Sequence, residues 1–330
     1  MINQKNVYFK NTSKEVRDKC IACPFASVII PVYNDPYGLK DTLKSLVVQD
    51  FPTQYFEIII VDNGSTDNTM NIAKEFAQKY PKLVRVLLDN SIQSSYAARN
   101  KGIKASKGTI IAFIDADMSV DKDWLARIVS SLEKYRVDYL ACKVEIYLKE
   151  NSIFGLYNKM TGFPIEKYIS NNHFAPTCCL IVRKIVFERV GFFDSKLISS
   201  GDYEFGNRVY RFGYKLYYDS SIVMKHPARS SFKQIFCKFF RIGRGSQQIS
   251  FYYTKYYKEM HRSILNLRNY LPSKPWSFFK SMKGYKIWNK SSLITRIGFY
   301  LINWQVKVAI QIGYIYESIR IKKKKRNKAG

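Results

Sequence analysis

Two aspartates that flank a single alanine, Asp115 and Asp117, form the pair of residues best suited to chemistry in this sequence. They end an apolar run that begins at Thr109, where a buried strand is expected to stop. Hard divalent cations such as Mg²⁺ and Mn²⁺ prefer oxygen ligands and usually share them with phosphate groups. One of the two carboxylates can instead cap the next helix, but Asp121 lies closer to the start of that helix. Both carboxylates are then free, and the pair predicts a site for a divalent cation and a diphosphate.

Two other predicted strands also end in polar sequence, at Tyr33-Asn34-Asp35 and at Asp62-Asn63-Gly64. In open α/β sheets, ligands bind outside the carboxyl ends of the strands. Asp62 can accept a hydrogen bond from a base or a ribose, or its side chain can close a turn. The sequence contains neither GxGxxG after the first strand nor GxxxxGK[ST], which argues against a dinucleotide dehydrogenase and a P-loop enzyme. The phosphates of a ligand must therefore be neutralised by a metal and by basic residues.

These polar ends belong to an alternation of apolar runs with segments of helical spacing, which predicts a doubly wound, mainly parallel α/β sheet. The runs are continuous in apolar residues, as is typical of strands buried on both faces. The predicted strands are Ser27–Tyr33, Glu57–Asp62, Leu83–Asp89 and Thr109–Asp117. After Val137 the pattern is mixed, with a further strand, a helix and a turn at Gly191.

The C-terminal third is aromatic and strongly basic. Residues 231–330 contain 22 Lys and Arg against two Glu, so they carry +20 of the total charge of +28. One segment places Phe232, Ile235, Phe236, Phe239 and Phe240 on one helical face and is expected to end at its glycines, Gly243 and Gly245. A second amphipathic segment runs from Ile294 to Ile315, and the Lys-rich end from Lys322 to Lys328 is expected to be disordered.

These two helices suit an anionic membrane surface, because aromatic and basic residues alternate at helical spacing and no nucleic-acid-binding module is present. Two alternatives remain open: both helices pack on the rest of the protein, or the charge binds nucleic acid. The polar N-terminus is not expected to be a signal peptide, and no uncharged apolar run reaches the ~18–20 residues of a spanning helix. The six cysteines lack the spacing of a zinc site, and the adjacent Cys178 and Cys179 fit buried thiols in a reducing compartment.

Four segments, taken in their order, closely resemble the family 2 glycosyltransferases of the GT-A fold. They are SVIIPVYN, EIIIVDNGSTDNT, AARNKG and IIAFIDADM, and the similarity extends roughly from Ser27 to Arg229. Each segment alone is a weak signal, but the combination in this order is highly specific. The resemblance implies a nucleotide-diphospho-sugar transferase fold over residues 25–230, after a leader of residues 1–24. Residues 231–330 would then be a helical basic extension.

The resemblance also implies roles for particular residues around a nucleotide-sugar donor. Pro31, Tyr33 and Asp62 are expected to line the nucleotide pocket, and Arg99 is expected to lie near the base or the diphosphate.

The paired aspartates are similar to the DxD motif of that family. Asp115 is then expected to face the ribose and the metal, and Asp117 to bind the Mn²⁺ or Mg²⁺. His226 is expected to be a third metal ligand, although a single histidine is more often structural. Arg229 is expected to reach the leaving diphosphate.

SGDYEFGNR, at residues 200–208, is similar to the acidic acceptor-side motif of the family. Asp202 matches the proposed general base and Glu204 the trailing acid, whereas Gly201 stands where the family has its first acid. The alternative is that Asp202 caps a helix that starts at Tyr203. A base at Asp202 implies a single displacement with inversion at the anomeric carbon, because no second nucleophilic carboxylate is evident.

Together these features predict an inverting, metal-assisted glycosyltransferase that acts in cell-surface polysaccharide or glycolipid synthesis. The expected partners are a nucleotide-sugar donor, a lipid-linked glycan acceptor and an anionic membrane, with no nucleic acid. The expected location is the cytoplasm, peripherally at the inner face of the cell membrane. A nucleotide-sugar-binding protein without turnover and a nucleic-acid-binding protein are the alternatives.

Overall fold

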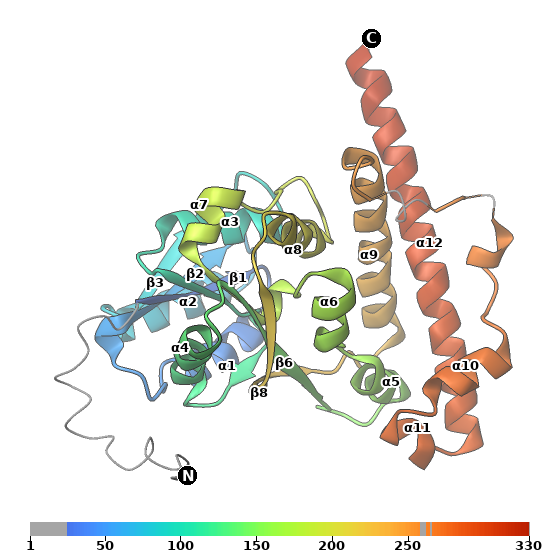
Figure 1. The fold of residues 1–330 in the computed structure, drawn as a ribbon, viewed down its shortest axis with the longest axis horizontal. Coiled ribbons are helices and arrows are strands. Elements are labelled where there is room, and N and C mark those ends of the chain that lie inside the picture. Colours follow the sequence, from blue (N-terminus) through green and yellow to red (C-terminus); the bar gives the residue numbers. More distant parts are fainter. Residues whose placement is uncertain (1–24, 258–261, 265, 330) are drawn as a thin grey trace, which may run out of the picture.

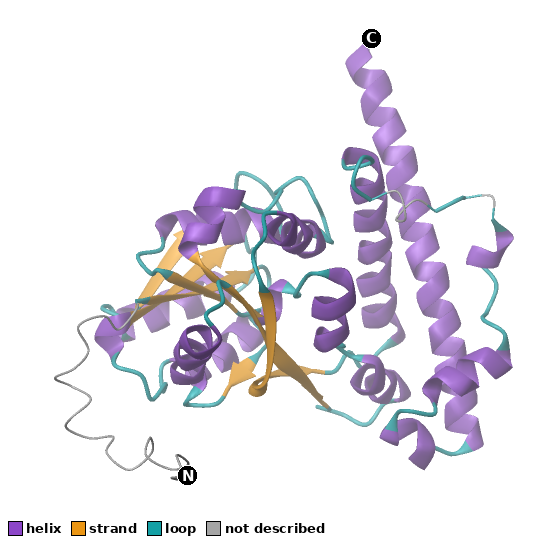
Figure 2. Cartoon of the chain, in the orientation of Figure 1, coloured by secondary structure: helices purple, strands orange, loops and turns teal. Residues whose placement is uncertain are grey.

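The computed structural model describes residues 25–257, 262–264 and 266–329 (Figure 1). The predicted leader of residues 1–24, with Cys20 and Cys23, lies outside the described residues. A sheet lies at the centre of the N-terminal part, with helices on both of its faces (Figure 2). The helices after residue 231 stand to one side of this sheet.

The described residues form an eight-stranded sheet with the order β3-β2-β1-β4-β7-β6-β8-β5. The neighbours from β3 to β4 are parallel, as are β6 and β8, so the sheet is mainly parallel as predicted. β7 runs antiparallel to β4 and β6, and β5 runs antiparallel to β8. The strand bounds are β1 Ala26–Val32, β2 Phe56–Asp62, β3 Val84–Leu88, β4 Ile110–Phe113, β5 Ser119–Val120, β6 Tyr139–Tyr147, β7 Leu180–Arg183 and β8 Leu216–Pro227.

The helices that surround the sheet follow the strands closely in sequence. In the first 230 residues they are α1 Pro36–Leu46, α2 Thr69–Lys79, α3 Ser95–Ala105, α4 Trp124–Tyr135, α5 Ile153–Thr161, α6 Ile165–Asn172, α7 Lys184–Val190 and α8 Gly201–Arg211. In the C-terminal third they are α9 Phe232–Tyr252, α10 Pro275–Met282, α11 Lys286–Lys290 and α12 Leu293–Ala329. Short 3₁₀ helices lie at Thr53–Tyr55, Thr177–Cys179 and Leu267–Asn269.

The prediction that the Asp121 side chain caps α4 is wrong. Asp123 occupies the N-cap position without a side-chain hydrogen bond, and the Asp121 carboxylate instead pairs with Lys225 of β8 at 2.7 Å. Neither Asp115 nor Asp117 takes over as the cap of α4. Both carboxylates at the end of β4 therefore remain free for another role.

The prediction that Gly243 and Gly245 end the first C-terminal helix is also wrong, because α9 continues to Tyr252. Both glycines lie at close helix contacts. A β-carbon on Gly243 would collide with the backbone of Ile310 in α12, and one on Gly245 would lie 2.6 Å from Ser199 O. The missing side chains let α9 approach two neighbours closely, so these glycines serve packing and do not break the helix.

α9 and α12 run side by side, and their contacts join two apolar clusters (Figure 1). Ile249 of α9 belongs to the main core of the sheet domain. Ile235 of α9 and Phe299 of α12 belong to a second cluster with Tyr157 and Met160 of α5. The first open alternative, packing on the rest of the protein, therefore holds for the inner faces of these helices.

α12 extends to Ala329, through the Lys-rich end that we expected to be disordered. That prediction needs correction: Lys and Arg are good helix formers, and they prolong a helix that is already nucleated and packed. Among the helices of the described residues, none has both the length and the apolar character needed to cross a bilayer.

Candidate active site

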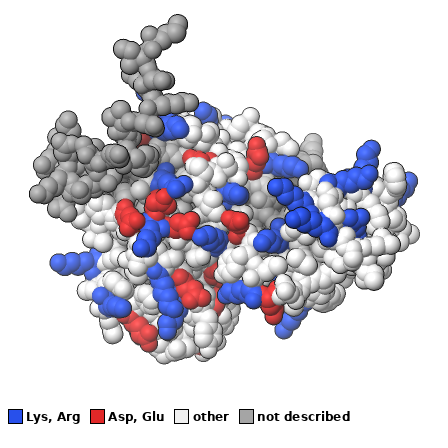
Figure 3. Space-filling view, turned by 90° about the horizontal axis from the view of Figure 1, so that it is seen from below, with Lys and Arg blue, Asp and Glu red and all other residues white. Residues whose placement is uncertain are grey.

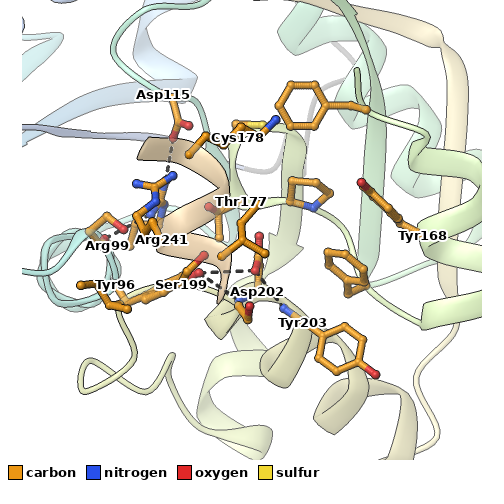
Figure 4. Close-up of a pocket in the computed structure, with 18 of the residues that line it drawn as sticks. Tyr96, Arg99, Asp115, Tyr168, Thr177, Cys178, Ser199, Asp202, Tyr203 and Arg241 are labelled. Atoms are coloured by element: carbon orange, nitrogen blue, oxygen red, sulfur yellow. Dashed lines mark hydrogen bonds and ion pairs between the residues drawn. The ribbon is translucent and has the colours of Figure 1, made fainter. Parts of the chain in front are cut away.

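A cavity of about 520 Å³ opens where the sheet domain meets α9 (Figure 4). Its walls come from the ends of β1 and β4, from α3, from the start of α8, from the end of β8 and from α9. The lining includes Pro31, Tyr96, Arg99, Asp115, Phe163, Tyr168, Thr177, Cys178, Asp202, His226, Arg229, Lys238 and Arg241. The structure thus brings most of the predicted site residues to one place, together with residues that the sequence did not single out.

Asp115 is held on the wall of this cavity by Arg99. The Arg99 Nη2 atom lies 2.6 Å from Asp115 Oδ1, and the Arg99 side chain is 5% exposed. The buried Nε atom of Arg99 makes no hydrogen bond to any described residue. Arg99 therefore orients Asp115, and its Nε–H group stays available as a hydrogen-bond donor. We predicted Arg99 near the base or the diphosphate of a donor, and the structure places it beside Asp115.

Asp117 faces His226. Asp117 Oδ2 lies 3.7 Å from His226 Nε2, which is too long for a hydrogen bond. Burial lowers the pKa of His226, and its Nδ1 atom lies 2.6 Å from Pro227 O, an arrangement in which Nδ1 carries the proton. The Nε2 lone pair of a neutral imidazole then faces a carboxylate oxygen with no proton between them.

This facing pair is a suitable donor set for a divalent cation, because imidazole nitrogen and carboxylate oxygen are both common ligands. No three His, Cys, Asp or Glu side chains converge on one point in the described part of the chain. Asp115, predicted as a metal ligand, is bound by Arg99 through its Oδ1 atom, and its role toward a metal stays a prediction. Any further ligands of a cation at Asp117 and His226 would therefore come from water or from a bound phosphate.

Asp35, which the sequence grouped only with a polar strand end, lines a second cavity of about 520 Å³ beside Asp117 and His226. Burial raises the pKa of Asp35, and the nearby charge of Asp117 adds to this shift. Arg229 lines both this cavity and the one that includes Asp202, so the two spaces adjoin. A concentration of negative charge at Asp35 and Asp117 again favours a cation here.

Asp202 lies in the first turn of α8 and lines the large cavity (Figure 4). The alternative of a cap before Tyr203 is wrong in its register, because the helix begins at Gly201 and Ser200 occupies the N-cap position. Asp202 Oδ1 accepts a hydrogen bond from the backbone N of Tyr203 at 3.0 Å and lies 3.4 Å from Tyr96 Oη. Burial raises the pKa of Asp202, which makes its carboxylate a stronger base than an exposed aspartate.

Tyr96 of α3 explains why glycine stands where the resembled family has an acid. Its Oη accepts the backbone N–H of Gly201 at 2.9 Å, and its ring packs so closely that a β-carbon on Gly201 would lie 2.8 Å away. An acidic side chain at residue 201 would displace this ring. The residue before the predicted base is therefore dictated by the packing of Tyr96.

Glu204, the other predicted catalytic acid, is not among the residues that line the cavity. Its buried carboxylate binds Arg208 through both oxygens, at 2.9 and 2.8 Å. Arg208 in turn donates to the carbonyl oxygens of Val190 and Phe192. The structure thus gives Glu204 a positioning role, in which it ties α8 to the end of α7. Arg208, four residues later in the sequence, was the available signal for such a pair.

The predicted nucleotide residues lie along two smaller cavities. Asp62 lines one of about 450 Å³ with Asn63 and Gly64, and Pro31 and Tyr33 line one of about 240 Å³ that also includes Asn63. Asp62 Oδ1 accepts hydrogen bonds from the backbone N and the Oγ of Ser65. Asp62 Oδ2 is buried and has no partner among the described residues. Oδ1 therefore closes the loop, as the turn alternative expected, and the role of Oδ2 toward a base or ribose stays a prediction.

The sequence did not single out Lys238 and Arg241 of α9 as site residues, although both line the large cavity. They belong to the basic segment that we had interpreted only as a membrane-binding face. Their spacing of three residues was a signal that both project on one side of a helix. Which side faces the cavity depends on the packing of α9 against the sheet domain, which periodicity alone does not give.

Comparison with known proteins begins with a family model, described as Glycosyl transferase family 2, that matches residues 27–191. The chain is 39% identical over 227 residues to glycosyltransferase AglE of Haloferax volcanii, covering 68% of this chain and 74% of that protein. It is also 25% identical over 221 residues to an enzyme of Methanococcus voltae, covering 64% of this chain and 69% of that protein. That enzyme is named dolichyl N-acetyl-α-D-glucosaminyl phosphate 3-β-D-2,3-diacetamido-2,3-dideoxy-β-D-glucuronosyltransferase.

Two solved structures share the fold at low sequence identity. The mannosyltransferase PcManGT of Pyrobaculum calidifontis, in complex with GDP-Man and Mn²⁺, has a TM-score of 0.61 and 17% identity. The similarity covers 89% of this chain and 87% of that one. Staphylococcus aureus TarS in complex with UDP-GlcNAc has a TM-score of 0.51 and 19% identity, covering 90% and 92%.

Proposed function

Because the chain belongs to glycosyl transferase family 2 and is therefore a glycosyltransferase that uses a nucleotide-sugar donor, we propose that it transfers the sugar with inversion in a metal-assisted single displacement. The observation that carries this proposal is the line of cavities. Asn63 joins the cavity of Asp62 to that of Tyr33, and Pro31 joins the latter to the cavity of Asp202. His226 then joins the cavity of Asp202 to that of Asp117. A nucleotide, a diphosphate with its cation and an acceptor hydroxyl each have a matching group along that line.

Asp202 is the proposed general base. An acceptor hydroxyl is a weak nucleophile at neutral pH, so a carboxylate must take its proton as its oxygen attacks the anomeric carbon. The proton passes to Asp202, the new C–O bond forms, and the bond to the diphosphate breaks with its electron pair. Asp115, the other carboxylate on the cavity wall, is engaged by Arg99 and is not positioned as a second nucleophile. A single displacement inverts the anomeric configuration.

Asp117 and His226 are the proposed ligands of Mn²⁺ or Mg²⁺, with Asp115 two residues away on the donor side. Such a cation would stabilise the negative charge that develops on the leaving diphosphate. The structural neighbour PcManGT is described in complex with Mn²⁺, which supports a divalent cation in this fold. Arg229, which lines both adjoining cavities, is placed to face the same diphosphate.

We also propose a lipid-linked acceptor and a site of action at the inner face of the cell membrane. The Methanococcus voltae relative is named for a dolichyl phosphate-linked acceptor, which supports the first part. The second part rests on the charge of +20 in residues 231–330 and on the Lys and Arg side chains that predominate on the side of the C-terminal helices (Figure 3). A soluble donor and a membrane-bound acceptor meet most readily at such a surface.

Calorimetric titration with UDP, GDP and dTDP, each with and without Mn²⁺, tests the donor half of this proposal. One nucleotide should bind clearly more tightly than the others, and its binding should weaken strongly without the cation. Asp117→Asn should lose at least about 10-fold in Mn²⁺-dependent affinity, because it removes a charged ligand.

Asp123→Asn is a matched control, since it makes the same substitution at an exposed aspartate that pairs with Arg127. It should bind nucleotide as the unaltered protein does. Equal affinity for every nucleotide in both conditions would refute the metal-assisted donor site.

A further inference from the structure

Three basic residues, Arg229, Lys238 and Arg241, line the cavity that includes Asp202. Only Arg229 has been given a role so far, toward the diphosphate of the donor. Arg229 follows β8, and Lys238 and Arg241 lie three residues apart on α9. All three line the same cavity as Asp202, and Figure 4 shows Arg241 directed into it from α9. The proposed base and these basic residues therefore face one shared space.

The cationic groups of these three residues are poorly compensated by the protein. The Nη1 atom of Arg229 is buried and has no hydrogen-bond partner among the described residues. Lys238 Nζ lies 5.0 Å from the ring centroid of Phe163, and no described carboxylate forms an ion pair with it or with Arg241. Burial lowers the pKa of Lys238 to about 7, and the nearby charges of Arg229 and Arg241 lower it further. Arg241 is exposed to solvent, but the unpaired Nη1 atom of Arg229 and the ammonium group of Lys238 are desolvated, and a cation in such surroundings is costly unless an anion joins it.

The nearby carboxylates already have other partners. Asp115 is bound by Arg99, and Asp117 faces His226 across the proposed cation position. A sugar nucleotide carries two negative charges on its diphosphate, which one divalent cation neutralises. A bound donor with its cation therefore leaves most of the charge of Arg229, Lys238 and Arg241 uncompensated.

We propose that Arg229, Lys238 and Arg241 form a subsite for a phosphate group of the acceptor, beside the base Asp202. This inference rests on the proposed glycosyltransferase function, because it places the phosphate on the molecule whose hydroxyl Asp202 deprotonates. Guanidinium and ammonium groups are the side chains that recognise phosphate oxygens through charge-assisted hydrogen bonds. Phe163 and Tyr168 line the same cavity and supply apolar surface next to these cations. The subsite thus fits a phosphate ester that carries both a sugar and an apolar chain.

Direct binding of a short prenyl phosphate tests this subsite without requiring turnover. Geranyl phosphate is the probe and geraniol is its uncharged control, both titrated into the full chain in the presence of UDP and Mn²⁺. The protein should bind geranyl phosphate and should bind geraniol at least about 10-fold more weakly, because the phosphate supplies charge-assisted bonds.

Lys238→Gln should weaken geranyl phosphate binding about 10-fold or more while changing the affinity for UDP with Mn²⁺ less than about two-fold. Lys238→Arg should retain most of the binding, since it keeps the charge. Lys233→Gln is the matched control, because it makes the same substitution at an exposed position of the same helix. It should behave as the unaltered protein does.

Three results would overturn the proposal. If UDP binds but geranyl phosphate binds no better than geraniol, the acceptor subsite is refuted while the donor function stands. If Lys238→Gln weakens UDP and geranyl phosphate equally, the three basic residues belong to the site of the donor diphosphate. If Lys238→Gln leaves both affinities unchanged, Lys238 takes no part in phosphate binding.

Discussion

Asp62 divides its two carboxylate oxygens between the fold and a ligand. Oδ1 accepts two hydrogen bonds from Ser65 and shapes the loop after β2, whereas Oδ2 is buried without a partner among the described residues. An unmet acceptor of this kind costs stability until a donor reaches it. The free oxygen therefore marks the place where a base or ribose is expected to bind.

Asp62→Asn should weaken the binding of the preferred nucleotide about 10-fold, because an amide can keep the bonds from Ser65 but presents N–H in place of the free acceptor. Calorimetric titration measures the change. Asp67→Asn is the control in the same loop, since Asp67 bonds Thr69 and does not line the cavity beside Asp62. Unchanged affinity in Asp62→Asn would show that the nucleotide does not reach this oxygen.

Asp202→Asn should abolish sugar transfer, with a loss of about 100-fold or more, and should leave donor binding intact. A base acts on the acceptor hydroxyl, so its removal affects the rate of transfer and not the affinity for UDP with Mn²⁺. Transfer to the acceptor and nucleotide titration are measured on the same preparation.

Glu204→Gln separates a base from a positioning residue. It keeps the shape of the side chain and weakens the pair with Arg208, so transfer should fall much less than in Asp202→Asn, while the urea midpoint falls. Near-normal transfer in Asp202→Asn, combined with loss in Glu204→Gln, would assign the base to Glu204.

The sequence pattern predicted which residues lie at the cavity more successfully than it predicted which side chains they pair with. Pro31 and Asp115 lie on one cavity because the carboxyl ends of parallel strands share one edge of the sheet, and Asp202 joins them from the first turn of α8. That Asp115 pairs with Arg99 depends on how α3 packs against β4, which residue spacing does not specify. Glu204 lies off this cavity and pairs with Arg208, because motif position does not show which way a helical side chain points.

For helices and strands too, the sequence predicted features that depend on neighbouring residues and missed those that depend on contacts between distant segments. The alternation of apolar runs with helical spacing was enough to predict the parallel strands from β1 to β4. It did not predict that β7 inserts antiparallel between β4 and β6, because strand order is fixed by pairing between distant segments. The glycines of α9 were taken as a helix end for the same reason, since their function depends on contacts with distant segments, of Gly243 with Ile310 in α12 and of Gly245 with Ser199.

Gly243→Ala should destabilise the protein by about 1–3 kcal/mol, because the added methyl group would collide with the backbone of Ile310 in the close contact between α9 and α12. The midpoint of urea unfolding measures this change. Gly284→Ala is the control, since a β-carbon there meets no atom within 4 Å. An unaltered midpoint in Gly243→Ala would mean that the two helices separate easily.

The whole molecule has an uneven distribution of charge and apolar surface. On the face shown in Figure 3, acidic and basic residues are mixed over the sheet domain, whereas basic residues predominate on the side of the C-terminal helices. α12 buries one face against α9 and leaves a second stripe exposed, made of Ile294, Ile297, Leu301 and Trp304. Their spacing of three or four residues places them on one side of the helix. A basic surface with an exposed apolar stripe matches the requirements of an interfacial helix.

The protein should therefore bind anionic membranes peripherally through the C-terminal helices. Each basic residue near an anionic surface contributes about 1 kcal/mol, and this part weakens as salt rises. The apolar stripe adds a contribution to membrane binding that salt does not remove.

Full-length protein should sediment with vesicles rich in anionic lipid at low salt and should be only partly released at high salt. Ile294→Glu combined with Leu301→Glu should reduce the salt-resistant fraction, because both side chains are more than half exposed and lie on the stripe. Ile185→Glu on α7, which is 39% exposed but lies on the sheet domain, should not reduce it. If the full-length protein stays in the supernatant with anionic vesicles at low salt, the charge of +20 in residues 231–330 must serve a different partner.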